Sequence, residues 1–261
     1  MVSFSLGPLS LRKVQMSKNR DQIVAYCNDT LKLHEHHDYG PMGLQVAGDE
    51  KVSGIACAVS VNLDVIERTK EAGANLLIVH HGLFWNNESR LHAPWEARVN
   101  ALDEAGITLL AYHLALDAHP KIGNNILLAR AMGLQSLTPW EDIGWSGVFN
   151  HPYSYLAFGK KIGRQLGAEP IAVITHEWVE RVAVIAGGAA QYIVNAHRDG
   201  FDTFVTGEPS EPSYNLAHDL GMNFFAFGHD KTERSGVQAL ARQVSKRFNV
   251  RWSFMDSENP V

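Results

Sequence analysis

Histidine and carboxylate side chains gather just after three hydrophobic segments of the chain, at residues 76–79, 107–112 and 223–227. These side chains belong to His80, His81, His113, Asp117, His229 and Glu233. The segments lack the alternation of half-exposed strands, so they predict strands covered on both faces. Ligands of open α/β sheets bind outside the carboxyl ends of the strands. Imidazole and carboxylate together suit a divalent ion such as zinc, iron or manganese.

The number of candidate ligands indicates two metal ions. Adjacent strand residues point to opposite faces, so His80 and His81 face one ion only if the chain turns between them. Five residues also exceed what one catalytic zinc takes. Two divalent ions that share a bridging carboxylate use all five. The predicted metal ligands are His80, His81, Asp117, His229 and Glu233.

Each element of this pattern also has an ordinary structural interpretation. Asp230 and Glu233 have the spacing of a helix capping box, a pair of histidines often lies on the surface, and Asp117 suits a turn. The conjunction of the three strand ends favours the metal site.

Other clusters are weaker. The run His34-Glu35-His36-His37-Asp38 lacks the second histidine of a zinc-protease helix, so we expect an exposed helix end. Residues 185–190, with Gly187 and Gly188, favour tight packing of a strand against a helix over an anion cradle. The surroundings of Cys27 and Cys57 are apolar, which predicts buried, unreactive thiols.

The order of elements predicts an α/β fold. Helices are expected at 62–73, 95–105, 157–166, 190–197, 213–220 and 230–247, and further strands at 181–185, 201–205 and 250–254. From about residue 135 the pattern loosens, which suggests a boundary. Residues 1–16 are interpreted as an N-terminal extension.

Composition excludes several classes of partner. The 261 residues carry 23 basic and 28 acidic side chains, a formal net charge of −5 that disfavours binding to nucleic acid. No apolar run approaches the roughly 18 to 20 residues that span a bilayer, so no membrane partner is expected. Two cysteines form no disulfide framework, and a cytoplasmic location fits best.

The chain resembles the NIF-three-like family of dinuclear metal-centre proteins, whose members are also known as GTP cyclohydrolase 1 type 2 homologues. The resemblance extends from about residue 20 over nearly the whole chain. The segments that carry it are 43–46 (GLQV), 78–84 (IVHHGLF), 112–117 (YHLALD), 206–208 (TGE) and 228–233 (GHDKTE). The chain departs from the family pattern at Gly40-Pro41, where the family has Asp-Asn, and at Gly82, where it often has proline.

The resemblance implies a fold of two similar α/β lobes with mixed sheets flanked by helices. The first lobe would comprise residues 17–130 and 229–261, and the second residues 131–228. It also implies that Glu233 bridges two metal ions bound by the five ligands named above, and that six chains form a ring-shaped homo-hexamer.

These observations lead to the hypothesis of a metal-dependent hydrolase that acts on a small-molecule substrate, nucleotide-like or heterocyclic. His113 and Glu208 follow predicted strands without being needed as ligands, so they are the candidates for catalytic proton transfer. The alternative is a metal carrier or scaffold protein without turnover of its own.

Overall fold

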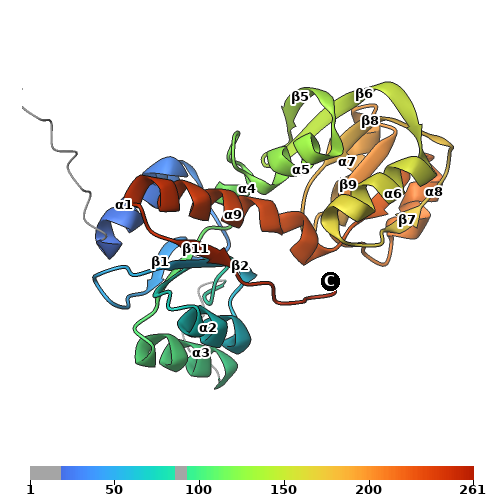
Figure 1. Ribbon diagram of the computed structural model, residues 1–261. Helices are drawn as coiled ribbons and strands as arrows, with labels where there is room; N and C mark the ends of the chain where they lie inside the picture. The colour runs from blue at the N-terminus through green and yellow to red at the C-terminus, as the bar shows by residue number, and fades with distance from the viewer. Residues whose placement is uncertain (1–18, 86–92) are drawn as a thin grey trace, which may run out of the picture.

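The computed structural model describes residues 19–85 and 93–261, so the predicted N-terminal extension lies outside the described residues. Two β-sheets organise them (Figure 1). The first sheet has the strand order β1-β4-β3-β2-β11, with all neighbours parallel except β1 and β4. Its strands are β1 (Gly43–Val46), β2 (Ile55–Ser60), β3 (Leu76–His81), β4 (Thr108–Ala111) and β11 (Trp252–Phe254).

The second sheet has the strand order β5-β6-β8-β9-β10-β7 and mixes parallel and antiparallel pairs. Its strands are β5 (Gln135–Trp140), β6 (Gly144–Ser154), β7 (Ile171–Val173), β8 (Trp178–Val184), β9 (Thr203–Thr206) and β10 (Asn223–Ala226). Two mixed sheets flanked by helices confirm the predicted α/β fold class. The lobe boundaries at residues 130 and 228 remain a prediction.

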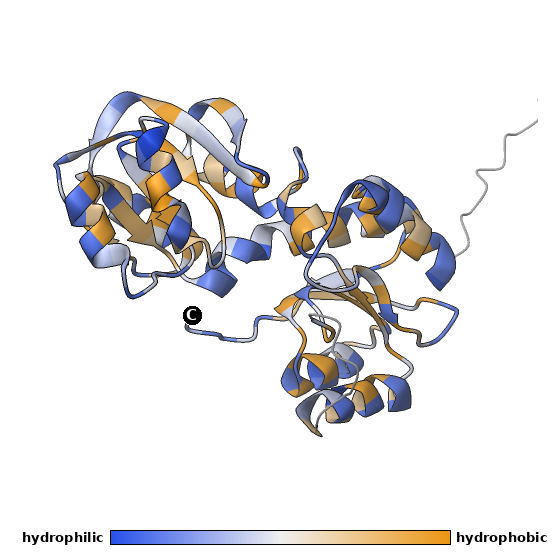
Figure 2. Cartoon of the chain, turned by 180° about the vertical axis from the view of Figure 1, so that it is seen from behind, coloured by the Kyte–Doolittle hydropathy of each residue, from blue (hydrophilic) through white to orange (hydrophobic). Residues whose placement is uncertain are grey.

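Helices cover both faces of each sheet. The α-helices are α1 (Arg20–Thr30), α2 (Leu63–Glu71), α3 (Ala93–Glu104), α4 (Leu114–Asp117), α5 (Asn124–Met132), α6 (Tyr155–Leu166), α7 (Ile193–Arg198), α8 (Ser213–Leu220) and α9 (His229–Phe248). The described residues also form the 3₁₀ turns η1 (Leu33–Glu35) and η2 (Ala190–Tyr192). In Figure 2 the helices carry alternating hydrophobic and hydrophilic bands, as amphipathic covers of a sheet must.

The strand β3 illustrates why the first sheet needs two covers. Ile78 packs into a cluster with α1 and α9, whereas Leu77 and Val79 pack into a cluster with α2 and α3. The residues from Leu76 to Val79 are all fully buried, which agrees with the absence of alternation in the sequence. The residues after Val79 therefore lie at the end of the strand, beyond the part of the sheet that the two helical layers cover.

The segment interpreted as a boundary near residue 135 forms the antiparallel pair β5 and β6. These strands were not expected, because β5 is an edge strand whose residues are mostly exposed and it shows no hydrophobic period. The other expected helices and strands exist with shifted ends; for example, the strand expected at 181–185 is Trp178–Val184. In the described part of the chain, no helix is long and apolar enough to cross a membrane.

Both cysteines are buried, free thiols, as expected. Burial raises the pKa of Cys27 to about 12, and it also raises that of Cys57. Neither thiol is positioned as a nucleophile at neutral pH.

Candidate metal centre

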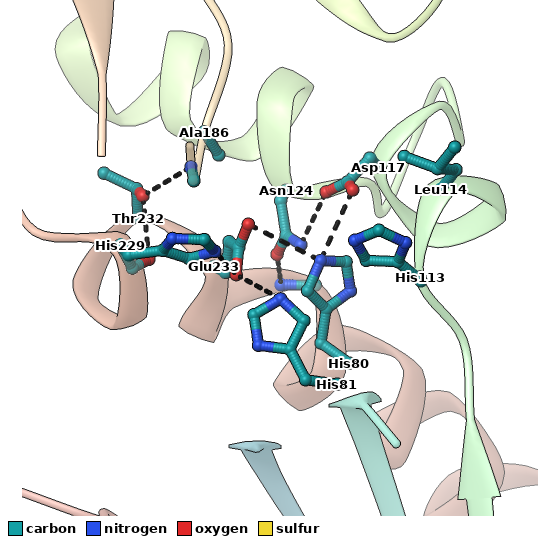
Figure 3. Close-up of polar contacts among 12 residues, drawn as sticks. His80, His81, His113, Leu114, Asp117, Asn124, Ala186, His229, Thr232 and Glu233 are labelled. Atoms are coloured by element: carbon teal, nitrogen blue, oxygen red, sulfur yellow. Dashed lines mark hydrogen bonds and ion pairs between the residues drawn. The ribbon is translucent and has the colours of Figure 1, made fainter. Parts of the chain in front are cut away.

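The five predicted metal ligands lie together where the open edge of the first sheet meets the start of α9 (Figure 3). His80 and His81 are the last residues of β3, and Asp117 ends the short helix α4 that follows β4. His229 and Glu233 lie one turn apart on α9, so both side chains project from the same face of the helix. The three segments are far apart in sequence, and the parallel strands bring their ends to one place.

The five side chains form two groups that share Glu233. In the first group, His80 Nε2 lies 3.3 Å from Asp117 Oδ2 and 3.6 Å from Glu233 Oε1. In the second group, His81 Nε2 and His229 Nε2 each lie 3.2 Å from Glu233 Oε2. The two histidines of β3 thus reach opposite oxygens of one carboxylate, which resolves the difficulty of their opposite strand faces.

A divalent cation fits these residues. Among the described residues, His80 Nε2 and Glu233 Oε2 are buried and have no hydrogen-bond partner. Such atoms cost free energy when buried alone, and the cost disappears when a cation is bound. The donor set of imidazole nitrogens and carboxylate oxygens is the set that zinc, iron and manganese accept.

The electrostatics of the centre favour positive charge. Burial lowers the pKa of His80, but the carboxylates of Asp117 and Glu233 raise it further, so that the net pKa is well above the ordinary value. Burial raises the pKa of Glu233, yet the surrounding histidines hold it well below the ordinary value. Glu233 is therefore a carboxylate in a buried position, and the centre attracts a cation.

A hydrogen bond at Nδ1 orients each histidine that is predicted to be a ligand. His80 Nδ1 donates to the carbonyl of Tyr112 at 2.9 Å, and His229 Nδ1 donates to the carboxylate of Glu208. His81 Nδ1 bonds Ser60 Oγ at 2.9 Å. Since a carbonyl and a carboxylate can only accept, Nδ1 of His80 and His229 carries a hydrogen, so that Nε2 is the nitrogen that can bind a metal once the ring is neutral. Such partners fix the ring and increase its basicity as a ligand.

Asn124, the first residue of α5, orients the predicted ligand Asp117. Its side-chain amide donates to Asp117 Oδ1 at 2.9 Å, which leaves Oδ2 directed at His80. Its oxygen accepts from the backbone amide of Gly236 at 2.8 Å, so the same side chain fastens α9. A Cβ at position 236 would lie 2.5 Å from that oxygen, and only glycine allows the approach.

Replacing Asn124 with leucine is expected to weaken metal binding by about 10- to 100-fold, because Asp117 loses the partner that fixes it. Metal affinity can be measured by competition with a chromogenic chelator. The matched control is Asn125→Leu, since Asn125 is equally buried but its side chain bonds Ala186, Ile143 and only the backbone of Asp117. Equal loss of affinity in both variants would show that Asn124 acts only through stability.

The structure places the two predicted proton-transfer residues differently. Glu208 follows β9 and bonds the ligand His229, so it orients that ring. His113 bonds no ligand carboxylate among the described residues; its Nδ1 lies 2.8 Å from Asp38 Oδ1. The expectation of an exposed helix end at residues 34–38 was wrong for Asp38, whose side chain is 1% exposed.

The structure also tests two other interpretations of the sequence, the capping box at Asp230 and Glu233 and the tight packing at Gly187. The N-cap of α9 is Gly228, and the carboxylate of Asp230 accepts from Arg234 at 2.5 Å, so Asp230 and Glu233 form no capping box. The Gly187 turn packs directly against Glu233, in agreement with the packing interpretation.

Sequence reasoning assigned no role at the centre to several residues that support it, namely Asp38, Gln45, Ser60 and Asn124. Gln45 lies in the Gly-Leu-Gln segment, and its oxygen accepts from the backbone of Leu83 at 2.7 Å, which fixes the loop after His81. A Cβ at Gly82 would collide with the Gln45 side chain. The family motif marked Gln45 as notable, but no spacing in the sequence connected it to the loop that it holds.

The fold and the centre together define an α/β protein with a histidine and carboxylate cluster suited to divalent metal. The chain belongs to the Duf34/NIF3 (NGG1p interacting factor 3) family, whose model matches residues 18–260, and the resemblance seen in the sequence is confirmed. A GTP cyclohydrolase 1 type 2 homolog of Allochromatium vinosum is 36% identical over 252 residues, which cover 94% of this chain and 98% of the relative. The relative of the same name in Pseudomonas aeruginosa is 38% identical over 230 residues, covering 86% and 91% of the two chains.

A solved structure supports the same assignment. The protein TTHA1606 from Thermus thermophilus superimposes with a TM-score of 0.87 at 32% sequence identity. The match covers 93% of this chain and 100% of that one. The similarity therefore extends over both sheets, not only the metal centre.

Proposed function

We propose that the protein is a metal-dependent hydrolase that uses two divalent ions and acts on a small nucleotide-like or heterocyclic substrate. The observation that carries the proposal is the pair of ligand groups, one with His80 and Asp117 and the other with His81 and His229, that share Glu233. One carboxylate with a ligand group at each oxygen is an arrangement that can hold a pair of ions.

Zinc, iron or manganese ions bound there would supply a nucleophilic water near neutral pH and polarise the bond to be broken. The chain supplies the rest. His113 is the candidate to take up and return a proton, and Glu208 holds His229 while its carboxylate remains partly exposed, so it stays a candidate for the same role. Trp85 lies edge-on to His113 with ring centroids 5.1 Å apart.

Two pockets beside the centre support a small-molecule substrate. A pocket of about 140 Å³ is lined by His81, His229 and Asp230, among others. A larger pocket of about 520 Å³ borders Glu208 and Lys231 and is within the usual size of small-molecule sites. The name GTP cyclohydrolase 1 type 2 homolog, carried by the relatives, favours a nucleotide-like compound.

The proposal is tested by metal analysis followed by a substrate screen. Protein purified without chelators should contain about two ions per chain, as a shared-carboxylate site predicts. The metal-loaded protein should then hydrolyse a member of a panel of nucleotides and nitrogen heterocycles, and His113→Ala should lose that activity. A protein that stays metal-free after incubation with zinc, iron and manganese rules the proposal out.

The second candidate is a metal carrier, which one observation favours. The side chains of His81 and His229 are 20% and 27% exposed, so the second ligand group is accessible from solvent. A carrier should give up its metal to a competing apo-protein within minutes, whereas a hydrolase should retain it during turnover. Metal exchange measured with and without the competing protein separates the two.

We also propose a homo-hexamer, a cytoplasmic location and no nucleic-acid partner. The first follows the family resemblance, the second is supported by the two free buried thiols, and the third by the net charge of −5. Light scattering tests the hexamer, which should have six times the 28.9 kDa mass of the chain.

A further inference from the structure

Asp38 is a buried carboxylate whose contacts all stabilise its ionised form. Its Oδ1 accepts from His113 Nδ1 at 2.8 Å and from the backbone amide of Tyr39 at 2.6 Å. Its Oδ2 accepts from the backbone amide of Leu114 at 2.8 Å. Burial raises the pKa of Asp38, but the bond to His113 and the backbone amides lower it below the ordinary value.

This carboxylate determines which nitrogen of His113 carries the hydrogen. An ionised carboxylate can only accept, so Nδ1 of the neutral ring is protonated and Nε2 carries the lone pair. One ring nitrogen from each of His80, His81 and His113 lies within 4.8 Å of the others. Because Nδ1 of His113 is bound to Asp38, Nε2 is the nitrogen that remains for the centre.

A second carboxylate and imidazole pair in the same centre shows what is different about His113. Glu208 holds Nδ1 of His229, but Nε2 of His229 faces Glu233 at 3.2 Å and belongs to a ligand group. His113 has no ion-pair partner except Asp38 among the described residues. Its Nε2 is therefore not held by a carboxylate on the other side.

Asp38 also fastens the loop that carries a ligand. His113 is the N-cap residue of α4 and makes no capping bond with its own side chain. Asp38 instead satisfies the first backbone amide of this helix, which ends in the ligand Asp117. One carboxylate thus fixes His113 and the helix of Asp117 relative to each other.

We propose that Asp38 is a positioning residue, which holds His113 as a proton acceptor at Nε2, and that His113 is not a metal ligand. The catalytic part rests on the proposed hydrolase function. As the attacking water loses a proton, its O–H bond breaks and an N–H bond forms at Nε2, and the imidazolium is stabilised by Asp38. Transfer of that proton to the leaving group restores the neutral ring.

The test measures the reactivity of His113 towards diethyl pyrocarbonate, which is attacked by an imidazole nitrogen that carries a lone pair. The reaction is run at pH 8 on the metal-free and the zinc-loaded protein, and each modified histidine is quantified by peptide mass spectrometry. The variants are Asp38→Asn and, as the matched control, Glu208→Gln. The internal reference is His34, whose side chain is 81% exposed.

In Asp38→Asn, the side-chain NH₂ group can donate to Nδ1, which moves the ring hydrogen to Nε2. The rate at His113 relative to His34 should then fall by about tenfold, because the wrong nitrogen carries the lone pair. Glu208→Gln should leave the rate at His113 unchanged. Zinc per chain should remain at the native value in His113→Ala. Unfolding cannot imitate this result, since it would expose His113 and increase its rate.

An unchanged or increased relative rate at His113 in Asp38→Asn would overturn the assignment of Asp38. Loss of zinc in His113→Ala would make His113 a ligand and equally overturn the proposal. A protein that binds no zinc at all would defeat the hydrolase function alone, because the metal-free reaction still reports on Asp38.

Discussion

Glu233→Gln is expected to reduce bound metal from about two ions per chain to fewer than one, because the amide cannot replace a shared carboxylate. Glu233 is 3% exposed, and its two oxygens serve both ligand groups. Glutamine keeps the shape of the side chain, so the change removes charge rather than volume. Metal per chain is measured by elemental analysis, before and after incubation with zinc.

A second effect should accompany the loss of metal. Two carboxylates, those of Asp117 and Glu233, raise the pKa of His80. In Glu233→Gln only Asp117 remains, so the pKa of His80 should fall. The buried polar atoms of the centre are then left without compensation, which typically costs several kcal/mol when one partner of a buried ion pair is removed. Zinc should consequently raise the melting temperature of the native protein and not that of Glu233→Gln.

The control for this prediction is Glu71→Gln, which removes the same charge from an exposed position at the end of α2. It should retain the native metal content and the stabilisation by zinc. If Glu233→Gln also retained about two ions per chain, the shared-carboxylate arrangement would be incorrect.

Much of the fold could be predicted because the buried strands have a simple signature. Leu76 to Val79 is a continuous apolar run, and Gly73 and Gly106 lie just after helices α2 and α3, as the sequence suggested. The same reasoning failed for β5, whose residues are mostly exposed and which is held to β6 by backbone hydrogen bonds. Hydrophobic period carries no information about such strands.

The positions that support the ligands could not be predicted for a different reason. Asp38 lies 75 residues before His113, and Asn124 lies 112 residues before Gly236. These contacts exist only after the sheets have formed, and neither residue type has a spacing relative to its partner that local periodicity can reveal. The predicted ligands could be selected because parallel strands end at a common edge, which is a property of the fold class.

The second large effect is expected at Gly187. This residue lies in the turn after β8, directly beside Glu233 and His229 of the second ligand group. Gly187 has φ of +68°, and a Cβ there would collide with Glu233 Oε1 and lie 3.0 Å from His229 Nε2. The turn cannot move away easily. Its amide donates to Thr232 Oγ1 at 3.1 Å, and its carbonyl accepts from the amide of Gly207 at 2.8 Å.

Gly187→Ala should therefore combine backbone strain with overpacking. The strain at positive φ costs about 1 kcal/mol for an L residue, and the collision adds about 1 to 3 kcal/mol. Chemical denaturation in the presence of a chelator measures this free energy without a contribution from metal. Metal affinity should fall more than tenfold as well, because the methyl group displaces Glu233.

Gly221→Ala separates the two causes. Gly221 has φ of +65°, nearly that of Gly187, but a Cβ there would meet nothing within 4 Å. This control should lose only the backbone term of about 1 kcal/mol and keep its metal affinity. The difference between the two variants measures the close approach of the second sheet to Glu233. Equal losses of stability and intact metal binding in both would mean that the Gly187 turn yields freely, so that the second sheet does not confine the metal centre.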